Sequence, residues 1–238
     1  MNIELSFIIV KYKGDVSKLV EQIHTFVKQS HEIIVSNNSE PTAIKETGVK
    51  VINNKKNLGY GKACNVAISQ AKGKFICILN PDIIINKDTV LELMKFMKNN
   101  PDAKIVAPKL LNDDGSLQLS CRTFPTVSIM LARNIPFMKK LFRKSLEKHN
   151  MLEYDRQTPK QVDWVSGAFM MLREKYFFDP AFFMYFEDVE LCKRVGNVWY
   201  CPNATTHHTA GHGSKRNAKL FYEHVKSMLY YFIKTHLQ

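Results

Sequence analysis

The stretch Ile76-Cys77-Ile78-Leu79-Asn80-Pro81-Asp82 decides the fold prediction. Its apolar, β-branched start predicts a buried strand, and the proline among polar neighbours predicts where that strand ends. In an open α/β sheet, ligands bind beyond the carboxyl ends of the strands, which is where Asp82 would lie. A carboxylate there suits a divalent cation that carries a diphosphate. Asn-Pro-Asp is also a common turn signal, so this stretch alone leaves both interpretations open.

The segments before and after this strand alternate between strand and helix patterns. Strands are expected at residues 5–10, 33–35, 49–52, 75–79 and 105–107, and helices at residues 16–29, 61–71 and 87–99. Such alternation is typical of parallel strands joined by crossover helices. The first 110 residues therefore predict an α/β fold with an open, mainly parallel sheet flanked by helices.

The pattern changes after residue 110. A hairpin is expected at residues 109–120, an irregular and then helical region at 125–151, and strands at 162–173 and 197–201. Helices are expected at residues 187–195 and 217–234. Because no repeat or linker interrupts the chain, we expect one domain over residues 1–238, with halves at 1–110 and 111–238.

The composition narrows the partners. The net charge of +12 implies an anionic partner: nucleic acid, an acidic membrane face or a phosphorylated substrate. Five scattered cysteines without a C-x-x-C pair argue against a disulfide framework and a zinc ribbon, and they fit a reducing cytosol. No apolar run approaches a membrane span, and the N-terminus lacks the features of a signal peptide. We therefore expect a cytoplasmic protein.

A glycine-bearing loop, Asn57-Leu58-Gly59-Tyr60-Gly61, enters the helix that carries Asn65. Backbone amides at a helix N-terminus would attract phosphate, although the glycines are also ordinary loop punctuation. Gly59, Gly61 and Cys64 half-match a dinucleotide fingerprint. That fingerprint belongs in the first βα turn, and this loop follows the third strand, so a dehydrogenase is disfavoured.

Three further segments carry candidate chemistry. Glu187 and Asp188 follow an aromatic run at a helix start, where they either complement the helix dipole or, if desolvated, supply a general base. His207, His208 and His212 lie in a polar, glycine-containing stretch, where one of them is a candidate metal ligand or all are structural. Beside Trp164, the small Ser166-Gly167-Ala168 notch either belongs to the core or admits a sugar ring.

The basic segment at residues 133–148, with interleaved apolar side chains, has two interpretations. It either lies on an anionic membrane face or is a solvated basic helix with a buried stripe.

In this order the motifs resemble those of family 2 glycosyltransferases with a GT-A fold, and most of all the rhamnosyltransferase-like branch that builds bacterial surface polysaccharides. The resemblance rests on residues 33–39, 57–65, 79–82, 122–125, 164–167, 182–194, 202–208 and 214–215. It implies that a sugar moves with inversion from a nucleotide-diphosphate sugar, linked to dTDP or UDP, onto a saccharide or a polyprenyl-diphosphate-linked acceptor. It further implies that residues 1–110 bind the nucleotide-sugar and that residues 111–238 bind the acceptor and carry the catalytic residues.

The resemblance also assigns roles to residues. Asp188 would be the catalytic base, with Glu187 beside it, and Asp82 and His208 would hold Mg²⁺ or Mn²⁺. Nucleotide-sugar binding would fall to Ser36, Asn38, Asn57, Gly59, Tyr60, Gly61, Asn65, Asn80 and Asp82. Acceptor binding would fall to Arg122, Trp164, Ser166 and Gly167.

The chain departs from the family pattern at three places: Ser36 stands where an aspartate usually reads the base, Glu190 replaces an aspartate, and the segment after Arg194 is short. These departures leave open a relative that binds the donor but is catalytically weak. A basic protein that binds nucleic acid or another anion is a further alternative; no nucleic-acid-binding motif supports it, and we expect no nucleic-acid partner.

Overall fold

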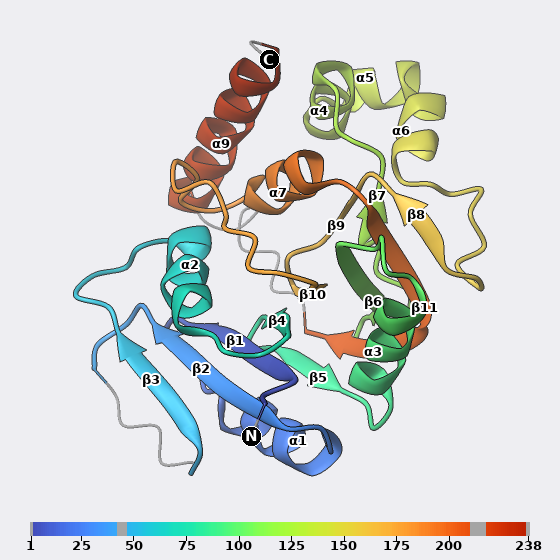
Figure 1. Cartoon of the computed structure of the whole chain (residues 1–238). Helices are drawn as coiled ribbons and strands as arrows, with labels where there is room; N and C mark the ends of the chain where they lie inside the picture. Colours follow the sequence, from blue (N-terminus) through green and yellow to red (C-terminus); the bar gives the residue numbers. More distant parts are fainter. Residues whose placement is uncertain (1, 42–46, 210–217, 237–238) are drawn as a thin grey trace.

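The computed structural model describes residues 2–41, 47–209 and 218–236 (Figure 1). Its strands are β1 (Leu5–Lys11), β2 (His31–Asn37), β3 (Val49–Asn53), β4 (Phe75–Leu79), β5 (Ile83–Ile85), β6 (Ile105–Leu111), β7 (Cys121–Arg122), β8 (Lys160–Val162), β9 (Trp164–Val165), β10 (Phe169–Leu172) and β11 (Val198–His208). Its helices are α1 (Ser17–Phe26), α2 (Tyr60–Gln70), α3 (Thr89–Asn99), α4 (Val127–Asn134), α5 (Pro136–Leu141), α6 (Arg143–His149), α7 (Glu187–Val195) and α9 (Ala218–His236).

Within the described residues, one mixed sheet of nine strands organises the fold. Its order is β3-β2-β1-β4-β10-β6-β11-β5, with β8 paired to β11. The strands β3, β2, β1 and β4 run parallel, as the βα alternation predicts. Strand β10 then lies antiparallel between β4 and β6, so a strand of the second half is inserted among strands of the first. The predicted α/β fold class is confirmed.

Both faces of the sheet are buried, which explains the nearly continuous apolar strands. Helices α1 and α3 cover one face, where they pack on Phe7, Phe75 and Leu79. Helices α2, α7 and α9 cover the other face, where they pack on Ile8, Ile78 and their neighbours (Figure 1). At about 25 cal/mol per Å² of apolar surface, this two-sided burial supplies most of the stabilisation of the fold.

The second half differs from its sequence prediction in three places. The single strand expected at residues 162–173 is three strands: β8 pairs with β11, β9 pairs with β7 in a separate two-stranded sheet, and β10 joins the main sheet. The small residues of the notch stand between β9 and β10 and let the chain change sheets. The region at residues 125–151 forms three helices, α4, α5 and α6.

Strand β11 continues well beyond the expected residues 197–201. It shifts register between Cys201 and Thr205, next to Pro202, and then pairs with β5 through His208. His207 and His208 therefore lie on a strand, and not in the loop that the sequence predicts. His212 and the residue pair 214–215 lie outside the described residues.

Candidate active site

The first corner of the site forms where β4 ends. Asn80 and Asp82 follow β4, and the antiparallel pairing of β5 with β11 brings His208 beside them. His208 Nε2 lies 3.4 Å from Asp82 Oδ1 and 3.5 Å from Asn80 Nδ2. The structure thus brings His208 to Asn80 and Asp82, although it is more than 120 residues from both in the chain. We call these three residues, with Gln118, the metal corner.

Gln118 determines which nitrogen of His208 carries a proton. Its amide Nε2 donates to the His208 backbone oxygen at 2.7 Å, so its Oε1 is left to accept from the ring Nδ1 at 3.0 Å. Nδ1 therefore carries the hydrogen, and Nε2 presents its lone pair to the Asp82 carboxylate. A lone pair facing a carboxylate is favourable only when a proton or a cation lies between them.

The metal corner fits a divalent cation by this chemistry. A histidine whose second nitrogen donates to a fixed acceptor is the usual arrangement of a metal ligand. Two ligands of one Mg²⁺, at about 2.1 Å each, lie about 3 Å apart, close to the separation of the Asp82 and His208 atoms. In the part of the chain that the structure describes, no group of three or more His, Cys, Asp or Glu side chains could hold a metal. Substrate oxygens would have to complete the coordination.

The glycine loop is held by other protein groups. Gly59 has φ +82°, and a Cβ on it would come within 2.2 Å of the Phe183 backbone oxygen, so only glycine allows this approach. The Gly59 N–H donates to Asn57 Oδ1 and the Tyr60 N–H to the Phe183 oxygen. These two N–H groups are therefore engaged within the protein, and nucleotide-sugar binding by Gly59 and Tyr60 stays a prediction. Their visible role is to fix the start of α2 against the segment before α7.

The polar residues after β2 form a network. Asn54 donates to Ser36 Oγ at 2.9 Å and to Asn38 Oδ1 at 3.0 Å, and Asn38 donates to the Gly59 oxygen. Ser36 is fully buried and Asn38 nearly so. Ser36 is therefore positioned to act on a nucleoside only indirectly, by orienting Asn54. The sequence does not mark Asn54 as a site residue. The Asn65 side chain is also occupied, by the backbone of Phe178.

The second corner is the start of α7, which we call the acid corner. Tyr185 and Phe186, directly before Glu187, have φ of +68° and +64°, which is costly for aromatic residues. Asp188 Oδ2 accepts from the Gly167 N–H at 3.0 Å, and Oδ1 accepts from the Val189 N–H at 2.9 Å. The strained turn thus leads into the helix start at which Asp188 bonds the notch.

Burial controls the acidity of both carboxylates. It raises the pKa of Glu187 to about 8, helped by the neighbouring Asp188 charge. Burial also raises the pKa of Asp188, while the bonds from Gly167 and Val189 and the nearby Arg122 oppose the shift. Glu187 Oε2 has no hydrogen-bond partner among the described residues. Glu187 is therefore mainly protonated at neutral pH, while the two backbone N–H donors favour the charged form of Asp188.

Glu190 has a structural role on the same helix. Its buried carboxylate accepts from Lys234 Nζ at 2.7 Å and from Arg194 Nε at 2.9 Å. Lys234 also binds Asp179, so these pairs tie α9 to α7 and to the segment before it. The departure from aspartate at position 190 is explained by this clamp.

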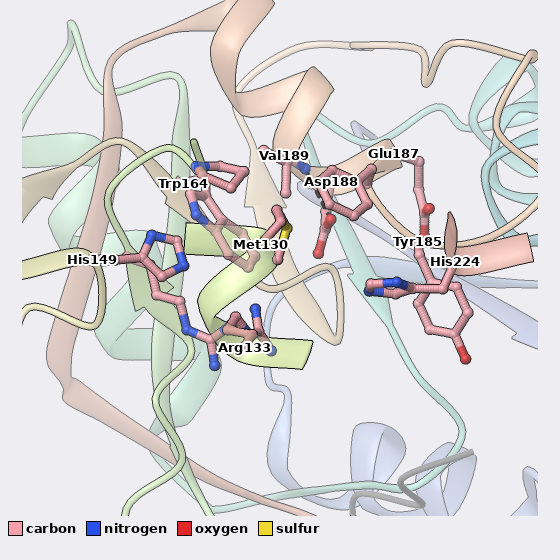
Figure 2. Close-up of a pocket in the computed structure, with 12 residues that line it drawn as sticks. Met130, Arg133, His149, Trp164, Tyr185, Glu187, Asp188, Val189 and His224 are labelled. Atoms are coloured by element: carbon pink, nitrogen blue, oxygen red, sulfur yellow. Dashed lines mark hydrogen bonds between the residues drawn. The ribbon is translucent and has the colours of Figure 1, made fainter. Parts of the chain in front are cut away.

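Asp188 opens into a cavity of about 180 Å³ (Figure 2). Arg122 and Trp164, two of the predicted acceptor residues, line it, with the Arg122 guanidinium 5.5 Å from the Trp164 ring. Gly167 contributes its N–H to Asp188, and its carbonyl accepts from the Tyr60 hydroxyl. Ser166 lies beside it and bonds the Ala168 N–H. The cavity is also lined by Arg133, from the basic segment, and by His149 and His224, which the sequence does not mark as site residues.

The notch joins the two corners. The Gly167 N–H binds Asp188, and the next residue, Ala168, accepts from the Asn80 N–H at 2.8 Å. A polar corner suited to a cation therefore lies one residue along the notch from a desolvated carboxylate. The fold and this paired site define a nucleotide-sugar transferase of the GT-A class.

Comparisons with known proteins agree with this class. Residues 6–178 match the family model described as glycosyl transferase family 2, and the chain belongs to that family of inverting glycosyltransferases. The match ends before α7, so it does not cover Asp188.

Three curated relatives are similar to the chain. Rhamnosyltransferase WbbL of Escherichia coli is 27% identical over 93% of this chain and 89% of its own length. The low-salt glycan biosynthesis hexosyltransferase Agl10 of Haloferax volcanii is 28% identical over 81% of this chain. The N-acetylglucosaminyl-diphospho-decaprenol L-rhamnosyltransferase of Mycobacterium tuberculosis is 28% identical over 76%. The chain spans only 61% and 65% of the latter two relatives.

Solved structures support the fold. The structure of residues 1–349 of Staphylococcus aureus TarS aligns with a TM-score of 0.60 at 16% identity, over 87% of this chain and 60% of that one. A complex of the same protein with UDP aligns equally well. At this identity the likeness shows the fold alone.

Proposed function

We propose that the chain transfers a hexose such as rhamnose from a dTDP- or UDP-linked donor to a saccharide or polyprenyl-diphosphate-linked saccharide in cell-surface polysaccharide synthesis. The observation that carries the proposal is the notch. Its Gly167 N–H bonds the Asp188 carboxylate, and the carbonyl of the next residue, Ala168, accepts from the Asn80 N–H. The names of the relatives support rhamnose or another hexose as the sugar, and one of them supports a lipid diphosphate on the acceptor.

The roles of the residues follow from their environments. Asp188 takes the proton of the acceptor hydroxyl while that oxygen forms a bond to the anomeric carbon of the donor. The bond from the anomeric carbon to the diphosphate oxygen breaks, and the nucleotide diphosphate leaves with the electron pair. Protonated Glu187 keeps a second negative charge away from Asp188. Attack from the side opposite the diphosphate gives inversion.

Asp82 and His208 would hold Mg²⁺ or Mn²⁺. When bound, the cation neutralises charge that develops on the leaving diphosphate. Gln118 keeps the Nε2 lone pair of His208 available for it. Asp82 is 41% exposed, so water and donor oxygens have access to the remaining coordination positions.

The chain is proposed to act as one domain over residues 1–238, peripheral to the inner face of a cell membrane. The insertion of β10 between β4 and β6 supports a single domain. The helices α4, α5 and α6 and the end of α9 lie at one end of the molecule (Figure 1). Exposed Phe137 and Leu141 stand there beside Lys139, Lys140 and Arg143, a mixture suited to an anionic membrane surface. In the described residues, no helix is both long and apolar enough to cross a membrane.

A panel of nucleotide-sugars with Mn²⁺, read by thermal unfolding, tests the proposal. One donor, at about 100 times its Kd, should raise Tm by about 5–10 °C, and less without the cation. Salt-dependent binding of DNA without any donor binding would instead favour a nucleic-acid-binding protein. Binding of NAD without UDP or dTDP would favour a dehydrogenase.

A further inference from the structure

The cavity at the acid corner has more cationic groups than the transfer reaction uses. Arg122 and Arg133 both line it, and neither forms an ion pair within the residues that the structure describes. Among the described residues, the carboxylates on its wall are Glu187, which is mainly protonated, and Asp188. The cavity therefore carries an excess of positive charge.

His149 adds an unsatisfied polar group to the same wall. Its side chain is only 1% exposed, and neither ring nitrogen has a well-aligned hydrogen bond among the described residues, although the Thr123 backbone lies near the ring. The Arg122 Nε is likewise buried without a partner. Buried polar groups are nearly always paired in native proteins, so unpaired groups on one cavity wall indicate a missing ligand.

The basic groups of the cavity act on one another around Arg133. Burial and the charges of Arg122 and Arg133 lower the pKa of His149 to about 4. Burial and Arg133 also lower the pKa of Arg122, to about 10, and that of His224. Figure 2 shows Arg133, His149 and His224 gathered around the space into which Asp188 points. An anion in this space would relieve all of these repulsions.

An apolar hollow continues from the cavity. It has a volume of about 490 Å³ and shares Pro125 with the cavity. Phe124, Val127, Tyr231 and Phe232 line it, so it runs between the start of α4 and the end of α9. Helices α5 and α6, which follow α4 in the chain, bear the exposed apolar and basic side chains described above. The Asp188 carboxylate is thus followed by the cationic cavity, then by the apolar hollow, and then by the exposed apolar side chains at the surface.

We propose that Arg122, Arg133 and His149 bind a phosphate or diphosphate ester on the acceptor sugar, and that the hollow takes the first carbons of an alkyl chain attached to it. The inference rests on the proposed transfer reaction, because it places the acceptor hydroxyl at Asp188. Two sources share this chemistry: a lipid-linked sugar diphosphate and a water-soluble sugar phosphate. The charge and the hollow together favour the lipid.

Calorimetric titration of the full chain tests the inference without knowledge of the acceptor sugar. The donor pocket is first saturated with Mn²⁺ and the nucleotide diphosphate that the donor panel identifies. Decyl diphosphate, below its micelle concentration, should then bind, and decyl glucoside should bind at least about tenfold more weakly. If methyl diphosphate binds at least about tenfold more weakly than decyl diphosphate, the phosphate belongs to a lipid-linked acceptor. Equal affinities of the two probes indicate a water-soluble sugar phosphate.

Substitutions locate the binding. Arg133→Ala removes a cationic side chain from the last turn of α4 and should weaken decyl diphosphate about tenfold or more. His149→Gln should weaken it to a lesser degree, with an unchanged circular dichroism spectrum. Lys95→Ala is the matched control, because Lys95 is exposed on α3, on the other face of the sheet, and pairs with Glu92; it should change the affinity less than about twofold.

The possible failures are distinguishable. Absence of nucleotide binding overturns the proposed function. Nucleotide binding with no diphosphate binding, with equal binding of decyl glucoside, or with full affinity in Arg133→Ala overturns the phosphate site alone.

Discussion

The acid corner and the metal corner bond neighbouring residues of the notch, Gly167 and Ala168, yet one corner is apolar and the other is polar. Asp82 is 41% exposed, and its nearest partners are the polar side chains of His208 and Asn80. Asp188 lies among Trp164, Tyr185 and Phe186, and burial raises its pKa. Two aspartates that look alike in sequence are therefore suited to different tasks.

The difference shows how environment assigns a role to a carboxylate. A solvent-accessible carboxylate with polar neighbours can share a cation with substrate oxygens. A carboxylate that is desolvated by apolar neighbours takes a proton more readily. We therefore assign charge compensation to Asp82 and proton removal to Asp188. Substitutions at the two corners test this difference.

The largest effect is expected at the acid corner. Asp188→Asn keeps the size of the side chain but removes the base, so kcat should fall by about 10²–10⁴-fold. Initial rates of transfer measure it. Asp102→Asn, in an exposed turn away from both corners, is the matched control and should retain the wild-type rate. A wild-type rate for Asp188→Asn would show that Asp188 is not the catalytic base.

An intermediate effect is expected at Gln118. Gln118→Leu removes the acceptor of the His208 Nδ1 proton and frees the ring to turn, so Mn²⁺ affinity should fall about 10- to 100-fold. Titration of Mn²⁺ in the presence of donor measures the change. Gln157→Leu, at an exposed position, should leave the affinity unchanged. Equal Mn²⁺ affinity in both variants would show that His208 needs no orientation by Gln118.

The smallest effect concerns stability at the acid corner. The pKa of Glu187 is raised to about 8, so the folded state retains a proton that the unfolded state loses above pH 4.5. The stabilisation from this proton is complete below pH 4.5 and is lost as the pH rises through about 8. Glu187→Gln removes this dependence and should gain at least about 1 kcal/mol relative to wild type between pH 5 and pH 8. Urea unfolding at the two pH values checks it, and parallel profiles would contradict the raised pKa.

The sequence predicted the parts of the site that follow apolar runs. Asp82 comes three residues after the end of β4 at Leu79, and Asp188 comes two residues after the aromatic segment ends at Phe186, so local patterns locate both. The small size of Ser166-Gly167-Ala168 likewise marks the notch that the two corners share. Local hydrophobic patterns are sufficient wherever a functional residue stands at the end of its own element.

The remaining residues depend on contacts that local patterns do not carry. Gln118 reaches His208 across 90 residues, and Asn54 joins Ser36 and Asn38 from the next strand. The short strand β5, which positions His208, has three residues, too few to show a period. Arg133 and His149 come from a region that reads as irregular, and only the packing of α4 and α6 brings them to one cavity.

Donor-binding isotherms with and without Mn²⁺, measured for wild type, Asp82→Ala and Asp188→Asn, test the division of roles most directly. We predict that Mn²⁺ tightens donor binding in wild type and in Asp188→Asn to the same extent, within about twofold, and has no effect in Asp82→Ala. If Asp188→Asn lost the Mn²⁺ dependence, or if Asp82→Ala kept it, the two carboxylates would not have the separate roles assigned to them.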